Sequence, residues 1–116
     1  MKVVGHFVFD QPFVSLVITG ETVELLLDTG FNGQLMLPTD FLDRTGSVPV
    51  GEAEYVTADG NVMSANVYEV GILWFGERKR IYAVGTNSPL PLMGMGLLKR
   101  CRTLLDPRNA ALIIEP

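Results

Sequence analysis

Short runs of β-branched and aliphatic residues, separated by residues that favour turns, recur along the whole of this 116-residue chain. Residues 14–18 and 22–27 form two such runs, and only Thr19-Gly20-Glu21 separates them, which is typical of a β-hairpin. No run of apolar residues with helical spacing is long enough to form a substantial helix. The pattern therefore predicts an all-β, mainly antiparallel fold.

Two further hairpins are expected in the second half of the chain. Residues 54–58 and 62–68 flank Asp59-Gly60, and Asp-Gly between two strand-like runs is a strong hairpin signal because glycine tolerates the torsions of a tight turn. Residues 72–75 and 80–84 form another pair around Gly76-Glu77.

The remaining elements are short. Single strands are predicted at 34–37 and 112–114. One helical turn is predicted at Thr39–Arg44, with Thr39 as its cap and Gly46 as its end, and a short C-terminal helix at 97–102. The chain contains no repeats or linkers, so residues 1–116 are expected to form one domain.

Composition excludes several classes of function. A net charge of −4 with only 9 Lys and Arg argues against a nucleic-acid binder. A single Cys (Cys101) forms no internal disulfide, which suits a reducing compartment, and with a single His (His6) it leaves no His/Cys zinc site in one chain. We therefore expect no metal and no cofactor.

The apolar stretch at the N-terminus does not predict a membrane or export segment. Residues 3–9 are interrupted by Gly5 and His6 and followed by Asp10, which makes the stretch too short for a signal-peptide core or a membrane span. The expectation is a cytoplasmic protein with no membrane partner.

The segment Leu25-Leu26-Leu27-Asp28-Thr29-Gly30 holds the chemistry-bearing residue. A carboxylate that directly follows three aliphatic residues is unusual, because a charge is unfavourable to bury where a strand enters a core. Read without its context, Asp-Thr-Gly is also a reasonable turn at the end of a strand. The triplet is therefore a moderate signal, and its weight depends on the rest of the chain.

Taken with its surroundings, this segment resembles the catalytic loop of the retropepsin-like aspartic peptidases of clan AA, and in particular their small prokaryotic single-domain members. Asp59-Gly60 falls at the tip of the family's flap hairpin. The stretch Leu92-Met93-Gly94 resembles its hydrophobic-hydrophobic-Gly motif, preceded by an extended wall strand and followed by a helix. The resemblance covers most of the chain and is weakest between Pro38 and Tyr55.

The resemblance implies an aspartic endopeptidase with a closed β-barrel that acts as a homodimer. Because the chain contains one Asp-Thr-Gly, Asp28 of each of two chains would supply the two carboxylates that share a proton and activate a water. Thr29 would brace the two loops and Gly30 would offer its backbone to a peptide or protein substrate. The other implied substrate-binding residues are Phe31, Asn32, Leu35, Ala58, Asp59, Gly60, Leu90 and Leu92, and residues 112–114 would join a sheet shared by both subunits.

The chain departs from the retroviral pattern at three positions near the loop. Asn32 stands where viral enzymes carry an acidic residue, and Gln11 and Met95 stand where they carry the two arginines that hold it. We hypothesise that apolar and neutral polar contacts replace these charges in the dimer. Phe31, where a small residue is usual, is expected to reshape the adjoining pocket.

Two other functions stay open at this stage. A peptide-binding or dimerisation module with the same fold would share every feature except the need for an ionisable Asp28. An unrelated small β-barrel with a fortuitous triplet would not need Asp28 at a two-fold axis. The pair Trp74-Phe75 fits either a partner surface or a core position.

Overall fold

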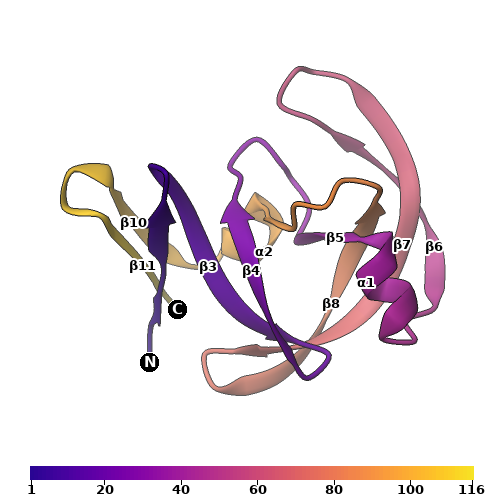
Figure 1. Ribbon diagram of the computed structural model, residues 1–116, viewed down its shortest axis with the longest axis horizontal. Helices are drawn as coiled ribbons and strands as arrows, with labels where there is room; N and C mark the ends of the chain where they lie inside the picture. The colour runs from indigo at the N-terminus through magenta and orange to yellow at the C-terminus, as the bar shows by residue number, and fades with distance from the viewer.

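The computed structural model describes residues 1–116 and confirms an all-β protein with few helical residues (Figure 1). The helices are α1 (Thr39–Arg44), α2 (Met95–Leu98) and a 3-10 turn (Pro107–Asn109). The strands are β1 (Val3–Val4), β2 (His6–Val8), β3 (Gln11–Ile18), β4 (Glu21–Leu27), β5 (Leu35–Pro38), β6 (Pro49–Val56), β7 (Val62–Trp74), β8 (Glu77–Thr86), β9 (Leu92–Met93), β10 (Arg102–Asp106) and β11 (Ala111–Glu115).

Most strands belong to one eight-stranded sheet, in the order β2-β3-β4-β9-β5-β8-β7-β6. All three expected hairpins are present in it as the antiparallel pairs β3–β4, β6–β7 and β7–β8. Only β4–β9 and β5–β8 run parallel. A further pairing of Ile18 with Ile72 joins β3 to β7, so strands from both halves of the chain meet there.

The core follows from the alternation of side chains along these strands. On β3, Val14, Leu16 and Ile18 are buried, while the residues between them face outward. The same alternation on β7 buries Tyr68, Val70, Ile72 and Trp74. Trp74 is therefore a core residue, and its ring contacts that of Phe75 at a centroid distance of 4.6 Å.

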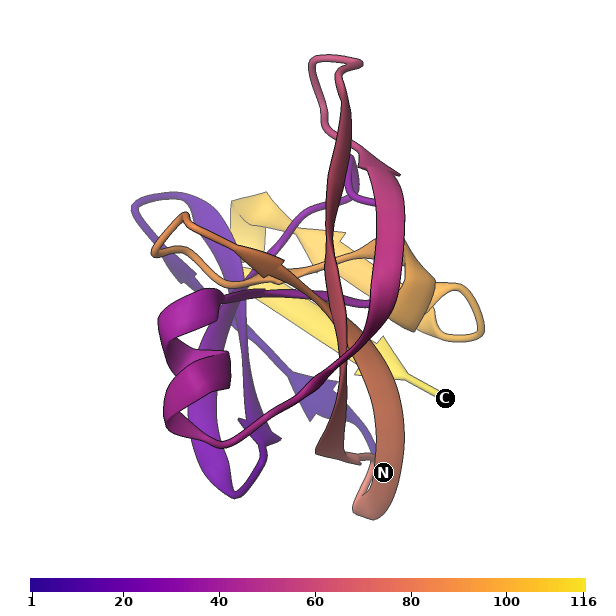
Figure 2. The same ribbon diagram turned by 90° about the vertical axis from the view of Figure 1, so that its right-hand side faces the viewer.

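Strand β7 is longer than the sequence pattern predicted. The two strands expected at 62–68 and 72–75 are one strand of 13 residues, Val62–Trp74. Gly71 lies within it without a break, because it adopts no positive φ and pairs with Arg80. The long strand continues from the core into the tall hairpin that projects from the molecule in Figure 2.

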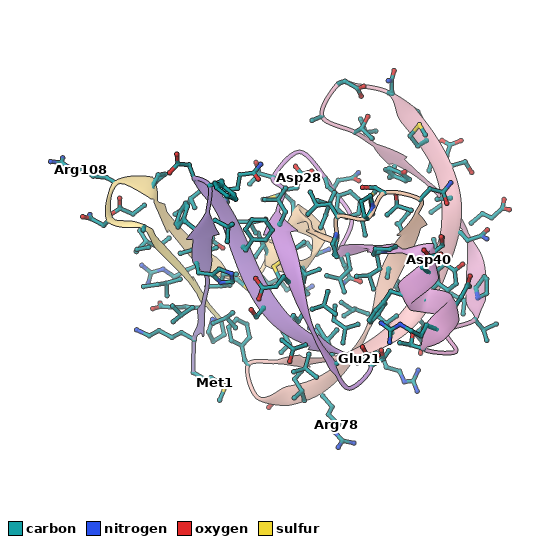
Figure 3. All side chains as sticks on the ribbon, viewed as in Figure 1. Met1, Glu21, Asp28, Asp40, Arg78 and Arg108 are labelled. Carbon is teal, nitrogen blue, oxygen red and sulfur yellow. The ribbon has the colours of Figure 1, made fainter.

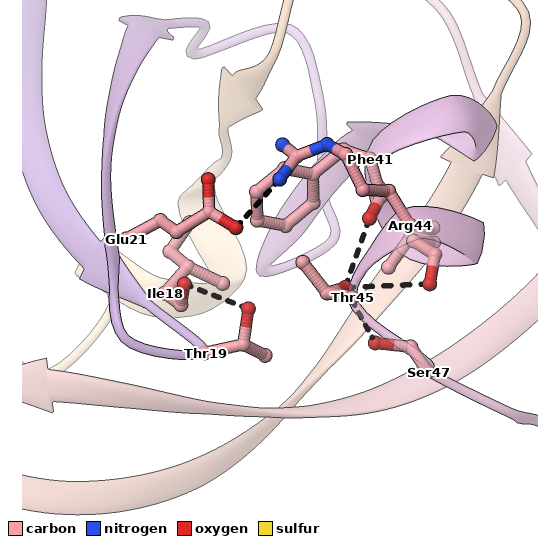
Figure 4. Close-up of polar contacts among 8 residues, drawn as sticks. Ile18, Thr19, Glu21, Phe41, Arg44, Thr45 and Ser47 are labelled. Carbon is pink, nitrogen blue, oxygen red and sulfur yellow. Dashed lines mark hydrogen bonds and ion pairs between the residues drawn. The ribbon is translucent and has the colours of Figure 1, made fainter.

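Helix α1 forms where the sequence predicted it, but Thr39 does not cap it. Pro38 occupies the N-cap position and no side chain caps the helix. At the other end, the Thr45 hydroxyl donates to the carbonyl oxygen of Phe41 at 2.8 Å (Figure 4), and Gly46 follows with φ +73°. The Arg44 guanidinium binds the Glu21 carboxylate at 2.7 Å, and this contact raises the pKa of Arg44 and ties α1 to the start of β4.

The prediction of a helix at 97–102 is wrong in its bounds. Helix α2 begins at Met95 and ends at Leu98, and Arg102 already belongs to β10. The apolar residues Leu97, Leu98 and Cys101 have helical spacing, but the chain leaves the helix once the first two are buried. No helix in the structure has the length and apolarity to cross a membrane.

The terminal strands form a separate three-stranded sheet in the order β1-β11-β10. Strand β11 is its central strand, because Val3 and Val4 pair with one edge and β10 pairs with the other. The expectation that residues 112–114 join a sheet shared with a second chain stays a prediction, and a second chain would meet this sheet at β1 or β10. A strand has two hydrogen-bonding edges, and both edges of β11 are taken within the chain.

Candidate active site

Asp28 directly follows β4, at a place fixed by three neighbouring strands. The short strand β9 lies between β4 and β5, parallel to the first and antiparallel to the second. The backbone N–H of Asp28 donates to the carbonyl oxygen of Met93 at 2.9 Å, and that of Leu26 donates to Pro91 at 2.9 Å. These bonds hold Asp28 at the rim of the sheet, where Figure 3 shows it beside the loop that leaves β4.

The loop after Asp28 orients its carboxylate. The backbone N–H of Gly30 donates to Asp28 Oδ1 at 2.8 Å, and the N–H of Phe31 donates to the Asp28 carbonyl at 3.2 Å. The side chain is half-buried and forms no ion pair with a basic residue. One carboxylate oxygen is thus held by a backbone donor, and the other has no hydrogen-bond donor within the chain.

The predicted motif Leu92-Met93-Gly94 and the residues that follow it pack against this loop and bind its backbone. Met93 is fully buried, and the N–H of Gly94 donates to the Gln34 carbonyl at 2.9 Å. The N–H groups of Met95 and Gly96 donate to the carbonyls of Phe31 and Gly33, at 2.8 Å and 2.9 Å. The start of α2 therefore satisfies the carbonyl groups of the Asp28 loop.

The β6–β7 hairpin is the one that the resemblance names as the flap, and its tip is held by Asp59. The Thr57 N–H donates to the Asn61 carbonyl at 3.0 Å, and Gly60 has φ +84°, which glycine adopts without strain. The Asp59 carboxylate accepts hydrogen bonds from the Thr57 hydroxyl and from Asn61, whose side-chain amide is 2.8 Å away. The Thr57 bond, followed by the backbone bond from Asn61, lowers the pKa of Asp59.

A cavity of about 280 Å³ lies between the Asp28 loop, the flap and the segment after β8. Among the predicted site residues, the structure brings together Asp28, Gly30, Phe31, Ala58, Leu90 and Leu92 around it. The flap approaches the loop closely, because a Cβ added to Gly30 would lie 3.2 Å from that of Ala58. Asp28 is the only carboxylate that lines the cavity.

Five predicted site residues do not line this cavity. Leu35 is fully buried in the main core, on the side of β5 opposite to Met36. Asp59 and Gly60 lie at the exposed flap tip, and Thr29 and Asn32 are exposed on the loop. Neither Asn32 nor its expected counterparts Gln11 and Met95 takes part in an ion pair, so no charge pair locks this loop within the chain.

Six lining residues were not foreseen from the sequence: Met36, Tyr55, Val56, Thr57, Thr86 and Ser88. The edge of the Tyr55 ring faces Phe31 at a centroid distance of 6.1 Å and an interplanar angle of 84°. The alternation of β6 and β7 around Asp59-Gly60 was a usable signal for the flap residues. The sequence contained no comparable signal for Thr86 and Ser88, because β8 extends to Thr86, beyond the apolar run at 80–84 from which the strand was predicted.

Other features of the surface are remote from Asp28. A larger hollow, of about 780 Å³, is lined by parts of β7, β8 and the loop after α1, including Arg78, Lys79 and Arg80. Figure 3 shows Arg78 on the side of the molecule opposite to Asp28. No group of three or more His, Cys, Asp or Glu side chains lies close enough together to hold a metal ion.

The arrangement is similar to that of several solved protein structures. One is the crystal structure of a retropepsin-like aspartic protease from Rickettsia conorii, with a TM-score of 0.70 and 16% identity, covering 98% of this chain and 90% of that one. The chain has the retropepsin-like fold. No family model matches its sequence, and no curated protein matches it.

Two viral structures share the retropepsin-like fold with this chain. The EIAV protease, in complex with the inhibitor HBY-793, has a TM-score of 0.61 and 18% identity, covering 78% of this chain and 86% of that one. The foamy viral protease-reverse transcriptase, in complex with an RNA/DNA hybrid, has a TM-score of 0.60 and 15% identity, covering 84% of this chain and 13% of that one.

Proposed function

We propose that this protein is an aspartic endopeptidase that works as a homodimer, with one Asp28 from each chain. The observation that carries the proposal is the position of Asp28: it is the only carboxylate at a cavity between a retropepsin-like loop and its flap, and Gly30 orients it. Hydrolysis by this route needs two carboxylates close enough to share a proton. One chain supplies one, so the second comes from another copy across a two-fold axis.

The reaction then follows from the two carboxyl groups. The ionised Asp28 accepts a proton from a water molecule, whose oxygen forms a bond to the carbonyl carbon of the peptide. The protonated Asp28 of the other chain gives its proton to the carbonyl oxygen. When the tetrahedral intermediate collapses, the C–N bond breaks and the leaving nitrogen takes up a proton from the Asp28 that accepted it from water. One hydroxyl of the intermediate returns its proton to the other Asp28, which restores the shared proton of the pair.

The cavity walls favour an extended substrate with apolar side chains. Phe31, Met36, Tyr55, Leu90 and Leu92 provide apolar surface beside Asp28. The flap would add main-chain hydrogen bonds in the manner of an extra strand. The exposed position of Thr29 leaves its hydroxyl free to brace the loop of a second chain. We further propose that the β3–β7 pairing closes the sheet into a barrel and that the protein acts in the cytoplasm.

The test compares wild type with Asp28→Asn on a diverse peptide library, from acidic to neutral pH. Asparagine keeps the shape of the side chain and its acceptor for the Gly30 N–H but does not ionise, so cleavage is expected from wild type only. Products of equal yield from both proteins would contradict the proposal. Peptides that bind to both proteins and are cut by neither would instead indicate a binding module.

A further inference from the structure

The hollow of about 780 Å³ that lies opposite to Asp28 opens at a break in the main sheet. On the edge of β7 that faces away from β8, β6 pairs as far as Tyr68 and β3 pairs only at Ile72. No strand pairs with residues 69–71 on this edge. The hollow, which we call the β7 hollow, is lined from both sides of this break, and its volume is within the ~300–1,000 Å³ usual for ligand pockets.

Gly71 lines the β7 hollow, and no contact within the chain explains a glycine at this position. Its φ is not positive, and an added Cβ would meet no atom within 4 Å. Neither torsion nor packing therefore requires glycine, although glycine weakens the interior of a strand. A glycine inside a strand often marks a place where a ligand or another backbone approaches closely. The missing side chain leaves open space in the hollow.

The open space beside Gly71 has apolar surroundings. Val48 and Val50, on either side of the start of β6, are 70% and 58% exposed and line the hollow. Leu73 is the next residue on the Gly71 face of β7, because side chains alternate along a strand, and it is also exposed. Exposed apolar residues that gather in one concavity indicate a binding surface, whereas single scattered ones do not.

The β7 hollow is positively charged, although the chain as a whole carries a net charge of −4. It is lined by three of the 9 Lys and Arg, in the run Arg78-Lys79-Arg80, and by one of the 13 Asp and Glu, Glu69. Glu69 binds Arg80 at 2.8 Å, whereas Arg78 and Lys79 form no ion pair. Arg78 lies opposite Leu73 in the β7–β8 ladder, so an unpaired guanidinium adjoins the apolar surface.

The hydroxyl groups that line the hollow already donate hydrogen bonds within the chain. The Thr19 hydroxyl donates to the Ile18 carbonyl at 2.8 Å. The Thr45 hydroxyl donates to the Phe41 carbonyl at 2.8 Å, and the Ser47 hydroxyl lies 3.3 Å from that of Thr45 (Figure 4). The side-chain donors that remain unbonded are therefore the cations of β8, and a ligand that satisfies them has to bring negative charge.

We propose that the β7 hollow binds an extended acidic segment of another protein, with an apolar side chain above Gly71 and a carboxylate on Arg78. In an extended segment, residues two apart share a face and lie about 6.6 Å from each other, which is also the spacing of Gly71 and Leu73 along β7. An arginine binds a carboxylate through two parallel hydrogen bonds. Because the rest of the chain is acidic, it repels such a segment from other surfaces.

This inference goes beyond the proposed function and does not depend on it, since the β7 hollow contains no residue of the Asp28 cavity. The first test measures the binding of synthetic peptides by fluorescence anisotropy. One set carries Glu two positions to either side of a central Leu, and a matched set carries Gln there. The Glu set is expected to bind about ten-fold more tightly at low salt and to lose this advantage as salt is added. Equal affinity of the two sets would overturn the proposal.

The second test reverses one charge inside the hollow and one outside it. Arg78→Glu and Arg108→Glu each replace an exposed arginine that forms no ion pair, and Figure 3 shows the two residues far apart. Arg78→Glu is expected to weaken binding of the Glu peptides by about ten-fold or more, and Arg108→Glu to leave it nearly unchanged. Equal losses would assign the binding to the net charge of the protein and contradict a site at Arg78.

The third test fills the hollow without changing its charge. Gly71→Leu occupies the open space and is expected to prevent binding of the Glu peptides. Gly51→Leu is the matched control, because an added Cβ there also meets no atom within 4 Å, its φ is not positive, and it does not line the hollow. Denaturation in urea checks that both variants fold. Wild-type affinity in folded Gly71→Leu would place the peptide elsewhere and overturn the proposal.

Two other occupants of the hollow are separated by the same variants. A single-stranded oligonucleotide that binds more tightly than the Glu peptides and is lost in Arg78→Glu would assign the hollow to nucleic acid. Self-association that sedimentation shows to be lost in Gly71→Leu would assign it to a second copy. Either result would overturn the proposed acidic segment.

The docking site and the peptidase can fail separately, because Asp28→Asn is expected to bind the Glu peptides as wild type does. A protein that binds these peptides through the β7 hollow and cleaves none in the library would keep the docking site and remove the peptidase. A protein that cleaves peptides and does not distinguish Glu from Gln in binding would keep the peptidase and remove the docking site.

Discussion

A Cβ atom at position 94 would lie 2.3 Å from the carbonyl oxygen of Gly33, so Gly94 permits the Asp28 loop to pack against the start of α2. The same added atom would lie 2.5 Å and 2.8 Å from the ring and the carbonyl oxygen of Phe31. Two of these three contacts involve backbone atoms, which do not move aside as a flexible side chain does. The requirement for glycine here is therefore one of space, because φ at Gly94 is −105°.

Gly94→Ala is expected to lower the free energy of unfolding by about 3 kcal/mol, the upper part of the usual range for overpacking. Denaturation in urea measures this change. Gly71→Ala is the matched control, because a Cβ at Gly71 would meet no atom within 4 Å and its φ is not positive. Equal stability of the two variants would show that the loop rearranges without strain.

Hairpins and helix ends were predictable from the sequence where a local torsion requirement decided them. Asp59-Gly60 marked the tip of the β6–β7 hairpin correctly, and Gly46 marked the end of α1. The orientation of β5 was not predictable, since Leu35, Met36 and Leu37 are all apolar and no alternation tells the core side from the cavity side. For that reason Leu35 was assigned to the site and Met36, which lines it, was missed.

The prediction of secondary structure in the C-terminal region was wrong for a different reason. Strand β10 contains adjacent leucines, which give no two-residue period, and the preceding Leu97, Leu98 and Cys101 have helical spacing. Only the pairing with β11 makes residues 102–106 a strand, and that pairing depends on long-range contacts that a local pattern does not contain. The sequence singled out Asp28, which lines the cavity, because a charge follows three aliphatic residues and the segment resembles a family's catalytic loop; its catalytic role stays a prediction.

Gly30→Ala is expected to lower kcat by at least ten-fold with little effect on stability. The added methyl would lie 3.2 Å from both the Cβ of Ala58 and Asp28 Oδ1, which is tight for a flap that has to close over substrate. Ala58→Gly in the same chain removes one of the two contacts and is expected to restore part of the activity. Steady-state kinetics of the single and double variants measure this coupling. An equal loss of kcat in the single and the double variant would show that only the contact of the added methyl with Asp28 lowers activity.

Phe31→Ala is expected to lower the free energy of unfolding by about 3 kcal/mol and to widen the cavity. The ring is 3% exposed and packs with Met36 and Val84, so its removal leaves a void beside Asp28. Cleavage should shift toward peptides with larger apolar side chains, as a library profile would report. Phe9→Ala, at a position 96% exposed, serves as a control that is expected to change neither stability nor profile. An unchanged cleavage profile for Phe31→Ala would show that the Phe31 side chain does not contact the substrate.

Acid is expected to loosen the flap tip through Asp59. The folded protein lowers the pKa of this carboxyl from its ordinary 3.8, first by the Thr57 hydroxyl bond and then by the Asn61 N–H. A group with a depressed pKa stabilises the folded form above its ordinary pKa, and the effect is lost as the pH falls through the lowered value. In an NMR titration the Asp59 carboxyl should therefore show a midpoint below 3.8, with the Asn61 amide signal moving in step. Asp59→Asn should remove that titration from the Asn61 signal, and a wild-type midpoint at or above 3.8 would mean that the tip is not held by these bonds in solution.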